Sequence, residues 1–268
     1  MRVAVVQMTS TDDLAANLAA ASAFVAEAAA GGAALVALPE NFAYLRREGQ
    51  AIPCAQDLDG EIVTRLRALA REGSLWLLGG SFPERIPGDA RVHNTSVLCS
   101  PDGEIAAVYR KIHLFDVDLA AQGGGSFRES AAVAPGKDVV VAATPFGGIG
   151  LSVCYDLRFP ELFRAHAARG ARFLAVPSAF ARETGRDHWE VLLRARAIEN
   201  QAFVLAPAQW GRHGPDRSSH GRSLIVDPWG TILAQAPDRA CVVVAECDLA
   251  HQDRIRESLP CLSHRKLI

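Results

Sequence analysis

Four residues of this chain have the types and positions that a nucleophilic site would need. Glu40, Lys111 and Cys154 each stand at the end of a run that is typical of a β-strand, and Glu129 lies in the glycine-rich segment 123–130. A cysteine that attacks a carbonyl or nitrile carbon needs a base for its proton and a cation or N–H donors for the oxyanion. Alone, each residue has an ordinary structural explanation, so only their combination indicates chemistry.

These residues must be positioned by strands and helices that alternate along the chain. Segments 101–103, 147–148 and 227–230 have the composition of hairpin turns. Alternating strands and helices with adjacent hairpins predict an α/β fold with mixed sheets. From apolar periodicity and from glycine and proline breaks, the predicted strands are 3–8, 34–39, 75–80, 172–178 and 202–209, and the predicted helices are 13–32, 60–73, 160–171 and 188–201.

The composition is that of an ordinary globular protein. Of the 268 residues 49% are hydrophobic, and the formal net charge of -2 gives no reason to expect a nucleic acid or membrane partner. The first apolar run is too short for a signal sequence. The six cysteines include no CxxC pair, which predicts reduced thiols in a cytoplasm and neither a disulfide frame nor a metal site. We expect one domain over residues 1–268, with a C-terminal tail from about 249.

Three short motifs carry a family resemblance. "LPENF" (38–42), "YRKIHLFD" (109–116) and "CYDLRFPE" (154–161) resemble the motifs of the nitrilase superfamily, the carbon–nitrogen hydrolases with a Glu-Lys-Cys site. The similarity covers nearly the whole chain. It implies a four-layer α-β-β-α sandwich of the nitrilase type, with Glu40, Lys111 and Cys154 as catalytic residues. "FRES" matches the second glutamate that many members carry, at Glu129.

These four residues predict a catalytic cycle that needs no metal or organic cofactor. Glu40 would take the thiol proton as general base, while the Lys111 ammonium favours the thiolate. Lys111 and the backbone N–H of Tyr155 would hold the oxyanion of the tetrahedral intermediate. Glu129 would position Lys111 or the substrate amide, and as a nearby carboxylate it would raise the pKa of Glu40.

The second half of the chain indicates the substrate. Segments 177–213 and 226–231 resemble the branch that includes ω-amidase and deaminated glutathione amidase, and are closer to the latter. That family hydrolyses an amide with a carboxylate at each end, so its pocket should present guanidinium groups. The candidate substrate-binding residues are Arg158, Arg182, Arg186, Arg212 and His188. Arg194 and Arg196 are better explained as ion-pair partners of nearby glutamates.

Two segments depart from the pattern of the resembled family and leave alternatives open. Residues 185–187 are Gly-Arg-Asp, and residues 220–223 are His-Gly-Arg-Ser. The alternatives are an ω-amidase that acts on 2-oxoglutaramate, an N-carbamoyl amino acid hydrolase, and a non-catalytic scaffold of the same fold.

The two helices after the nucleophile predict a homodimer. Segments 161–176 and 189–204 have more apolar positions at helical spacing than one buried face would need. A large exposed apolar patch usually marks an interface, and two-fold symmetry is its commonest form. The resembled family also pairs through this face. The apolar residues concerned are Leu162, Phe163, Val191, Leu192 and Ile198.

Overall fold

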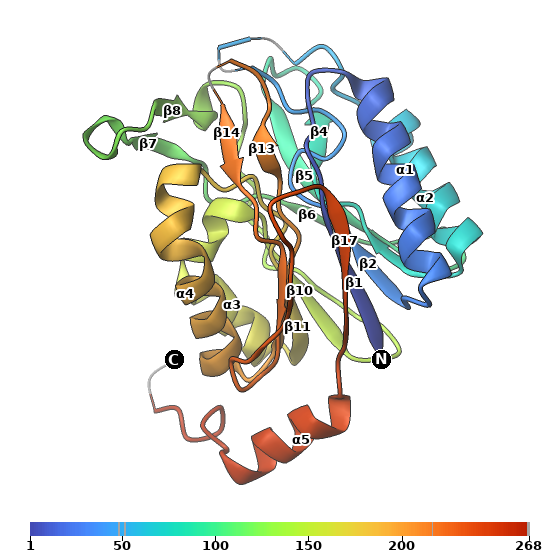
Figure 1. Ribbon diagram of the computed structural model, residues 1–268, viewed down its shortest axis with the longest axis vertical. Coiled ribbons are helices and arrows are strands. Elements are labelled where there is room, and N and C mark those ends of the chain that lie inside the picture. Colours follow the sequence, from blue (N-terminus) through green and yellow to red (C-terminus); the bar gives the residue numbers. More distant parts are fainter. Residues whose placement is uncertain (48, 51, 216, 267–268) are drawn as a thin grey trace.

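Two mixed β-sheets pack face to face at the centre of the molecule, and helices cover their outer faces (Figure 1). The computed structural model describes residues 1–47, 49–50, 52–215 and 217–266. Helices α1 (Leu14–Ala30) and α2 (Glu61–Gly73) lie on one side, with α3 (Pro160–Ala168) and α4 (Arg182–Asn200) on the other. This arrangement confirms the predicted four-layer α-β-β-α sandwich. In the described part of the chain, no helix is long and apolar enough to cross a membrane.

The first sheet carries two of the candidate residues, because Glu40 follows β2 and Lys111 follows β6. Its order is β17-β1-β2-β3-β5-β4, with β6 paired to β5. Strand β1 pairs with β2 in parallel and with β17 in antiparallel orientation, so the sheet is mixed. The seven strands are β1 (Arg2–Gln7), β2 (Leu35–Ala37), β3 (Trp76–Leu78), β4 (Phe82–Arg85), β5 (Val92–Cys99), β6 (Ile105–Arg110) and β17 (Cys241–Glu246).

The second sheet positions Cys154, which lies three residues beyond the end of β10. Its order is β16-β15-β12-β11-β10-β9, parallel among β10, β11 and β12 and antiparallel elsewhere. The six strands are β9 (Val141–Ala142), β10 (Gly148–Leu151), β11 (Ala171–Ala175), β12 (Phe203–Ala206), β15 (Leu224–Val226) and β16 (Ile232–Gln235).

The hydrophobic core has two parts, and β1 contributes to both. Val3 and Val5 belong to the part of the core that includes residues of both sheets, whereas Ala4 and Val6 belong to the part that includes residues of α1 and α2. Side chains alternate between the two faces of a strand, so a strand buried on both faces is apolar throughout. On α1 the buried residues recur every three or four positions, as a helix packed on one side requires; they are Leu18, Ala21, Val25 and Ala28.

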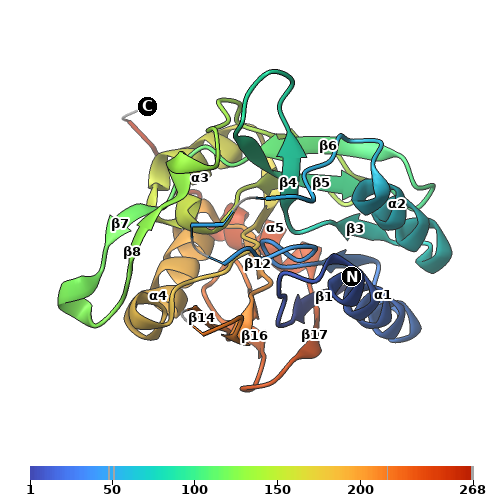
Figure 2. The same ribbon diagram turned by 90° about the horizontal axis from the view of Figure 1, so that it is seen from above.

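Several elements differ from the sequence prediction. Helix α4 begins at Arg182, six residues before the predicted start, and the segment predicted as a tail forms helix α5 (Leu249–Ser258). The glycine-rich segment that precedes Glu129 closes a hairpin of β7 (Asp116–Asp118) and β8 (Ser126–Arg128), which projects from the body of the molecule (Figure 2). A second unpredicted hairpin pairs β13 (Trp210–Arg212) with β14 (Ser218–His220).

Candidate active site

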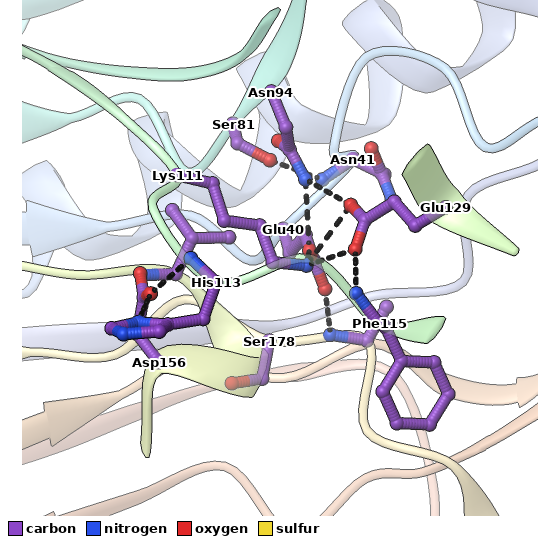
Figure 3. A network of polar contacts seen from close by, with 12 residues as sticks. Glu40, Asn41, Ser81, Asn94, Lys111, His113, Phe115, Glu129, Asp156 and Ser178 are labelled. Atoms are coloured by element: carbon purple, nitrogen blue, oxygen red, sulfur yellow. Dashed lines mark hydrogen bonds and ion pairs between the residues drawn. The ribbon is translucent and has the colours of Figure 1, made fainter. Parts of the chain in front are cut away.

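Glu40 is buried between the sheets, with only 3% of its surface exposed. Its Oε1 accepts hydrogen bonds from Lys111 Nζ and Asn94 Nδ2, both at 2.9 Å, and its Oε2 accepts one from the Ala179 N–H at 2.8 Å (Figure 3). Ala179 follows β11 of the second sheet. A buried carboxylate stays ionised only where donors replace its hydration. The three donors, which come from both sheets, therefore fix this carboxylate in one place.

Lys111 lies one residue beyond β6 and is 2% exposed. Besides its bond to Glu40, its Nζ donates to Glu129 Oε1 and Oε2 at 3.0 and 2.9 Å. Its backbone is held on both sides, since its N–H donates to the Asn94 carbonyl and its own carbonyl accepts from the Gly136 N–H. All three protons of the ammonium group therefore point at carboxylate oxygens.

Glu129 completes the cluster from a short 3-10 helix, η2 (Glu129–Ala131), just after β8. Its Oε2 accepts the Phe115 N–H at 2.7 Å, and its Oε1 accepts from Asn94 Nδ2 at 3.3 Å. Asn94 thus bridges the two carboxylates, a role that the sequence analysis missed. It lies on β5, which pairs with β6, so the pairing of these strands brings it beside Lys111.

Cys154 begins a second 3-10 helix, η3 (Cys154–Arg158), where the chain turns after β10. Its φ of +48° lies in the left-handed region, and its N–H donates to the Pro177 carbonyl. Such a conformation is costly for a residue with a side chain and is concentrated at functional sites. The thiol is 8% exposed and lines the same pocket as Glu40, Lys111 and Glu129. The structure therefore brings together all four residues that the sequence analysis singled out.

The charges of Glu40 and Lys111 stabilise each other. Burial alone raises the pKa of Glu40, but the Lys111 charge and hydrogen bonds from Lys111, Cys154 and Ala179 bring it below its ordinary value. We expected Glu129 to raise this pKa, and that expectation is wrong because the charge of Lys111, which lies against Glu40, and the hydrogen bonds to Glu40 outweigh the effects that raise it. Burial lowers the pKa of Lys111, but Glu129 and Glu40 outweigh it and leave this pKa well above the ordinary value.

The surroundings of Cys154 favour its protonated form. Burial and the charge of Glu40 raise the pKa of Cys154 far above its ordinary value. Lys111 lowers the pKa, in the direction we expected, but it does not offset the other two effects. The cysteine therefore needs a base to become a nucleophile. The pKa of Glu40 lies below its ordinary value and its side chain lines the same pocket as the thiol, so Glu40 can be that base.

Asp156 connects the nucleophile turn to the strand that carries the lysine, and it was also missed. Its carboxylate is completely buried and accepts four hydrogen bonds. Tyr109 Oη (2.6 Å) and the Val153 N–H (2.8 Å) donate to Oδ2, and the N–H of His113 (3.0 Å) donates to Oδ1, which also contacts the His113 ring at 2.7 Å. Tyr109 and His113 flank Lys111 in the sequence. One side chain therefore holds Cys154 and Lys111 in register.

The pocket above these residues has about 860 Å³ of empty space, open to solvent at its mouth. Aromatic rings form much of its wall; they are Phe115, Phe127, Tyr155 and Phe180. Arg158 also lines it, with its guanidinium carbon 5.1 Å from the centre of the Phe180 ring and 5.9 Å from that of Tyr155. Tyr155 and Arg158 thus lie where the sequence analysis expected them.

The other predicted substrate-binding residues lie elsewhere. Four of these residues are exposed and are not among the described residues that line the pocket; they are Arg182, Arg186, His188 and Arg212. Arg182 and His188 fall on the first two turns of α4 because this helix begins earlier than predicted, although His188 Nδ1 reaches Arg158 Nη1 at 3.2 Å. Two other arginines, Arg46 and Arg217, line the pocket instead. Both lie in loops, and no periodicity in the sequence marks them.

Arg194 and Arg196 form the predicted ion pairs. Arg194 lies 3.6 Å from Glu190, and the buried Arg196 lies 3.0 Å from Glu199. Over the described ranges, no group of three or more His, Cys, Asp or Glu side chains could hold a metal ion.

Comparisons with known proteins agree with this geometry. Residues 2–257 match the family described as carbon–nitrogen hydrolase. The chain is 42% identical to the deaminated glutathione amidase of Synechocystis sp. (99% of this chain, 98% of the relative) and 44% identical to that of Homo sapiens (98% and 82%). The crystal structure of Saccharomyces cerevisiae Nit3, a member of the nitrilase superfamily, matches with a TM-score of 0.90 at 32% identity, over 100% of this chain and 97% of the other. The chain therefore belongs to the carbon–nitrogen hydrolase family and is a hydrolase of carbon–nitrogen bonds other than peptide bonds.

Proposed function

We propose that this enzyme hydrolyses the amide of deaminated glutathione to 2-oxoglutarate and cysteinylglycine. The observation that carries the proposal is the buried cluster of Glu40, Lys111 and Glu129 beside the thiol of Cys154, in a pocket whose mouth carries arginines. The name shared by the two relatives gives the substrate. The pocket and the substrate are complementary in charge, because the substrate has a carboxylate at each end.

The first step transfers the thiol proton to Glu40. Three donors hold the carboxylate in one orientation before substrate binds, so the base is already in position beside the pocket. The sulfur then bonds to the amide carbon, and the C=O electron pair moves onto oxygen.

Two donors would stabilise the oxyanion that forms. One is Lys111, which donates two hydrogen bonds to Glu129 in the resting site. One of these N–H groups can donate to the oxyanion instead, while the other keeps the lysine bound to Glu129. The second is the N–H of Tyr155, next to the nucleophile. Removing one such donor typically costs about two to three orders of magnitude in rate.

The protonated Glu40 then donates its proton to the leaving nitrogen, and cysteinylglycine departs. A water molecule that gives a proton to the same carboxylate attacks the thioester, and collapse of the second intermediate releases 2-oxoglutarate and restores the thiol. Arg158, held over two aromatic rings, would bind a carboxylate of the substrate in a bidentate manner.

Incubation with deaminated glutathione and detection of 2-oxoglutarate tests the proposal, with the Cys154→Ala variant as the blank. We expect deaminated glutathione to have a higher kcat/KM than 2-oxoglutaramate. A strong preference for 2-oxoglutaramate, or for an N-carbamoyl amino acid, would replace the proposed substrate. If the protein hydrolyses none of these amides, it is a non-catalytic scaffold of the same fold.

We also propose that the enzyme is a cytoplasmic homodimer with one domain. Val191 and Ile198 of α4 are 66% and 49% exposed, and Trp229 in the β15–β16 turn is 60% exposed. The Ile198 side chain packs closely on Gly230, next to Trp229, so helix and turn form one apolar surface. Leu162 and Phe163 are buried and take no part in it. All six cysteines are free, in line with a reducing compartment. Light scattering that gives about 28.6 kDa for an active sample would contradict the dimer.

A further inference from the structure

Charge is unevenly distributed along the depth of the pocket. The inner charged residues are Glu40, Glu129 and Lys111, whose formal charges sum to -1 and which are all bonded to one another. The other charged residues of the lining are three arginines, Arg46, Arg158 and Arg217. An anionic ligand is therefore repelled by the inner cluster and attracted by the outer part. A ligand with two carboxylates can therefore bind a different guanidinium group with each of them.

Arg158 is held in place by the protein itself. Its guanidinium lies over the rings of Phe180 and Tyr155, and its Nη1 lies 3.2 Å from His188 Nδ1. It is four residues from the nucleophile on the same short helix. A carboxylate that it binds must therefore lie close to the reacting carbon.

Arg217 enters the pocket from the β13–β14 hairpin. It also lines a smaller adjoining cavity of about 450 Å³, together with Phe115, Phe127 and Ala181. Across the described ranges, the Arg217 guanidinium has no hydrogen bond or ion pair to another residue. Glu183 and Ser218 line the adjoining cavity but not the main pocket. Arg217 thus marks the boundary between the pocket and an outer cavity, with its donors unused.

The hairpin that carries Arg217 is firmly anchored. His213, which is buried, contacts the Ser10 carbonyl through Nδ1 at 2.9 Å and the Ser219 hydroxyl through Nε2 at 2.8 Å. The Arg217 carbonyl accepts the His213 N–H. A guanidinium on a fixed backbone loses less freedom when it binds a carboxylate.

We propose that Arg217 binds the carboxylate of the substrate that is remote from the scissile amide, which in deaminated glutathione is the carboxylate of the terminal glycine. This inference rests on the proposed function. Two residues separate that carboxylate from the leaving nitrogen, a span of up to about 7 Å when extended. Phe115, Phe127 and Arg217 line both the main pocket and the adjoining cavity, so a carboxylate that extends from the one toward the other meets Arg217.

This assignment is tested by measuring kcat/KM for two substrates with the unmodified enzyme and with three variants. The substrates are deaminated glutathione and its derivative with a carboxamide at the glycine end, which differ only in the remote charge. The variants are Arg217→Gln, Arg217→Lys and, as the control, Arg212→Gln. Arg212 lies on the same hairpin, is exposed and does not line the pocket, so its substitution makes the same change in net charge.

We expect the unmodified enzyme to prefer the carboxylate over the carboxamide by about 10- to 100-fold in kcat/KM, as one charge-assisted bidentate contact would give. Arg217→Gln should reduce this preference to about one without slowing turnover of the carboxamide. Arg217→Lys should keep part of the preference, and Arg212→Gln should keep all of it.

Four outcomes would overturn the assignment. A preference that survives in Arg217→Gln, or one that is lost equally in Arg212→Gln, would exclude a specific role for Arg217. An equal loss of activity on both substrates would show that Arg217 supports the structure of the site instead. Failure of the unmodified enzyme to hydrolyse either substrate would overturn the proposed function, and this inference with it.

Discussion

At the floor of the pocket, Glu40 and Lys111 lie within three residues of a strand end and are almost completely buried. At its rim, Arg46 and Arg217 come from loops and are partly exposed. The charged groups of the floor form hydrogen bonds to other residues of the protein, as Lys111 and Glu129 show. The guanidinium of Arg217 has its donors free of protein partners in the described part of the chain.

This difference separates two tasks. Groups that move protons and stabilise charge must be held before substrate arrives, because reorganisation during the reaction is costly. Groups that select a substrate need to complete their contacts only when it binds. Mutations at the floor should therefore lower kcat, and mutations at the rim should change the preference between substrates.

The largest effect should come from the nucleophile. We expect Cys154→Ala to reduce kcat roughly 10⁴-fold or more, because no other group can form the thioester. The fold should persist, since a smaller side chain is accommodated at the same backbone position. Turnover assays and circular dichroism check this. Residual activity within tenfold of the unmodified enzyme would remove Cys154 from its assigned role.

Glu40→Gln should be nearly as damaging, with a loss in kcat of about 10³-fold. The amide keeps the shape of the side chain but cannot accept the thiol proton, and it leaves Lys111 with one less countercharge. Labelling of Cys154 with iodoacetamide should slow in parallel, which intact-mass measurements would show. Unchanged labelling would mean that another base activates the thiol.

Asp156→Asn tests whether the floor depends on fixed geometry. The amide cannot accept four hydrogen bonds, so the turn at Cys154 and the strand end at Lys111 should lose their register. We expect kcat to fall about 10- to 100-fold with little change in KM. Tyr109→Phe, which removes a single bond, should have a smaller effect in the same direction. A change in KM alone would place Asp156 in substrate binding.

Acid should destabilise the protein through two buried histidines, one behind the strand that leads to Cys154 and one in the hairpin that carries Arg217. Burial lowers the pKa of His166, on α3 beside Gly150 of β10, to about 4, and it lowers the pKa of His213 in the hairpin of Arg217 to about 4 as well. The unfolded chain binds these protons at about 6.5. The contribution of these two histidines to the free energy of unfolding should therefore be level well above pH 6.5 and decrease as the pH falls from 6.5 toward 4.

Urea unfolding between pH 4.5 and 7.5 would measure this decrease, which we expect to be on the order of 2 kcal/mol per histidine at pH 4.5. His166→Leu should remove about half of the dependence. Both ring nitrogens of His166 are buried without a partner among the described residues, so the substitution leaves no broken hydrogen bond. An unchanged slope would assign the acid sensitivity to other groups.

The smallest expected effect concerns salt. Raising the salt concentration from about 0.05 to 0.5 M should reduce kcat/KM for deaminated glutathione about three- to tenfold, because solvent ions screen the arginines of the rim. The value of kcat at saturation should stay constant, since the floor is shielded from solvent. A parallel loss in kcat would show that salt reaches the floor too.

The sequence predicts the floor far better than the rim, for a physical reason. Glu40, Lys111 and Cys154 follow strands, and the edges of packed sheets bring strand ends together. The short motifs that surround these residues also resemble those of a known family. Asp156 lies inside the motif at 154–161 and could have been noticed there as an acidic residue among apolar neighbours. Asn94 had no such signal, since only the pairing of β5 with β6 places it.

The rim depends on where turns and helices begin. Arg182 and His188 were expected at the mouth, but α4 starts at Arg182 and presents them on its exposed surface. Arg212 and Arg217 lie on one hairpin, and only the second lines the pocket. Which of two arginines in a short hairpin faces inward depends on its register, and the local sequence contains no pattern that fixes it.

The place of β1 in the first sheet has a consequence for how the chain folds. This strand pairs on one side with β17, and the hydrogen-bonded residues Arg2 and Glu246 are 244 positions apart. During synthesis, the apolar strand β1 has an open edge until almost the whole chain has left the ribosome. Open apolar edges promote aggregation, and contacts of such long range slow folding. Refolding yields should therefore depend strongly on protein concentration, and chaperones should raise them.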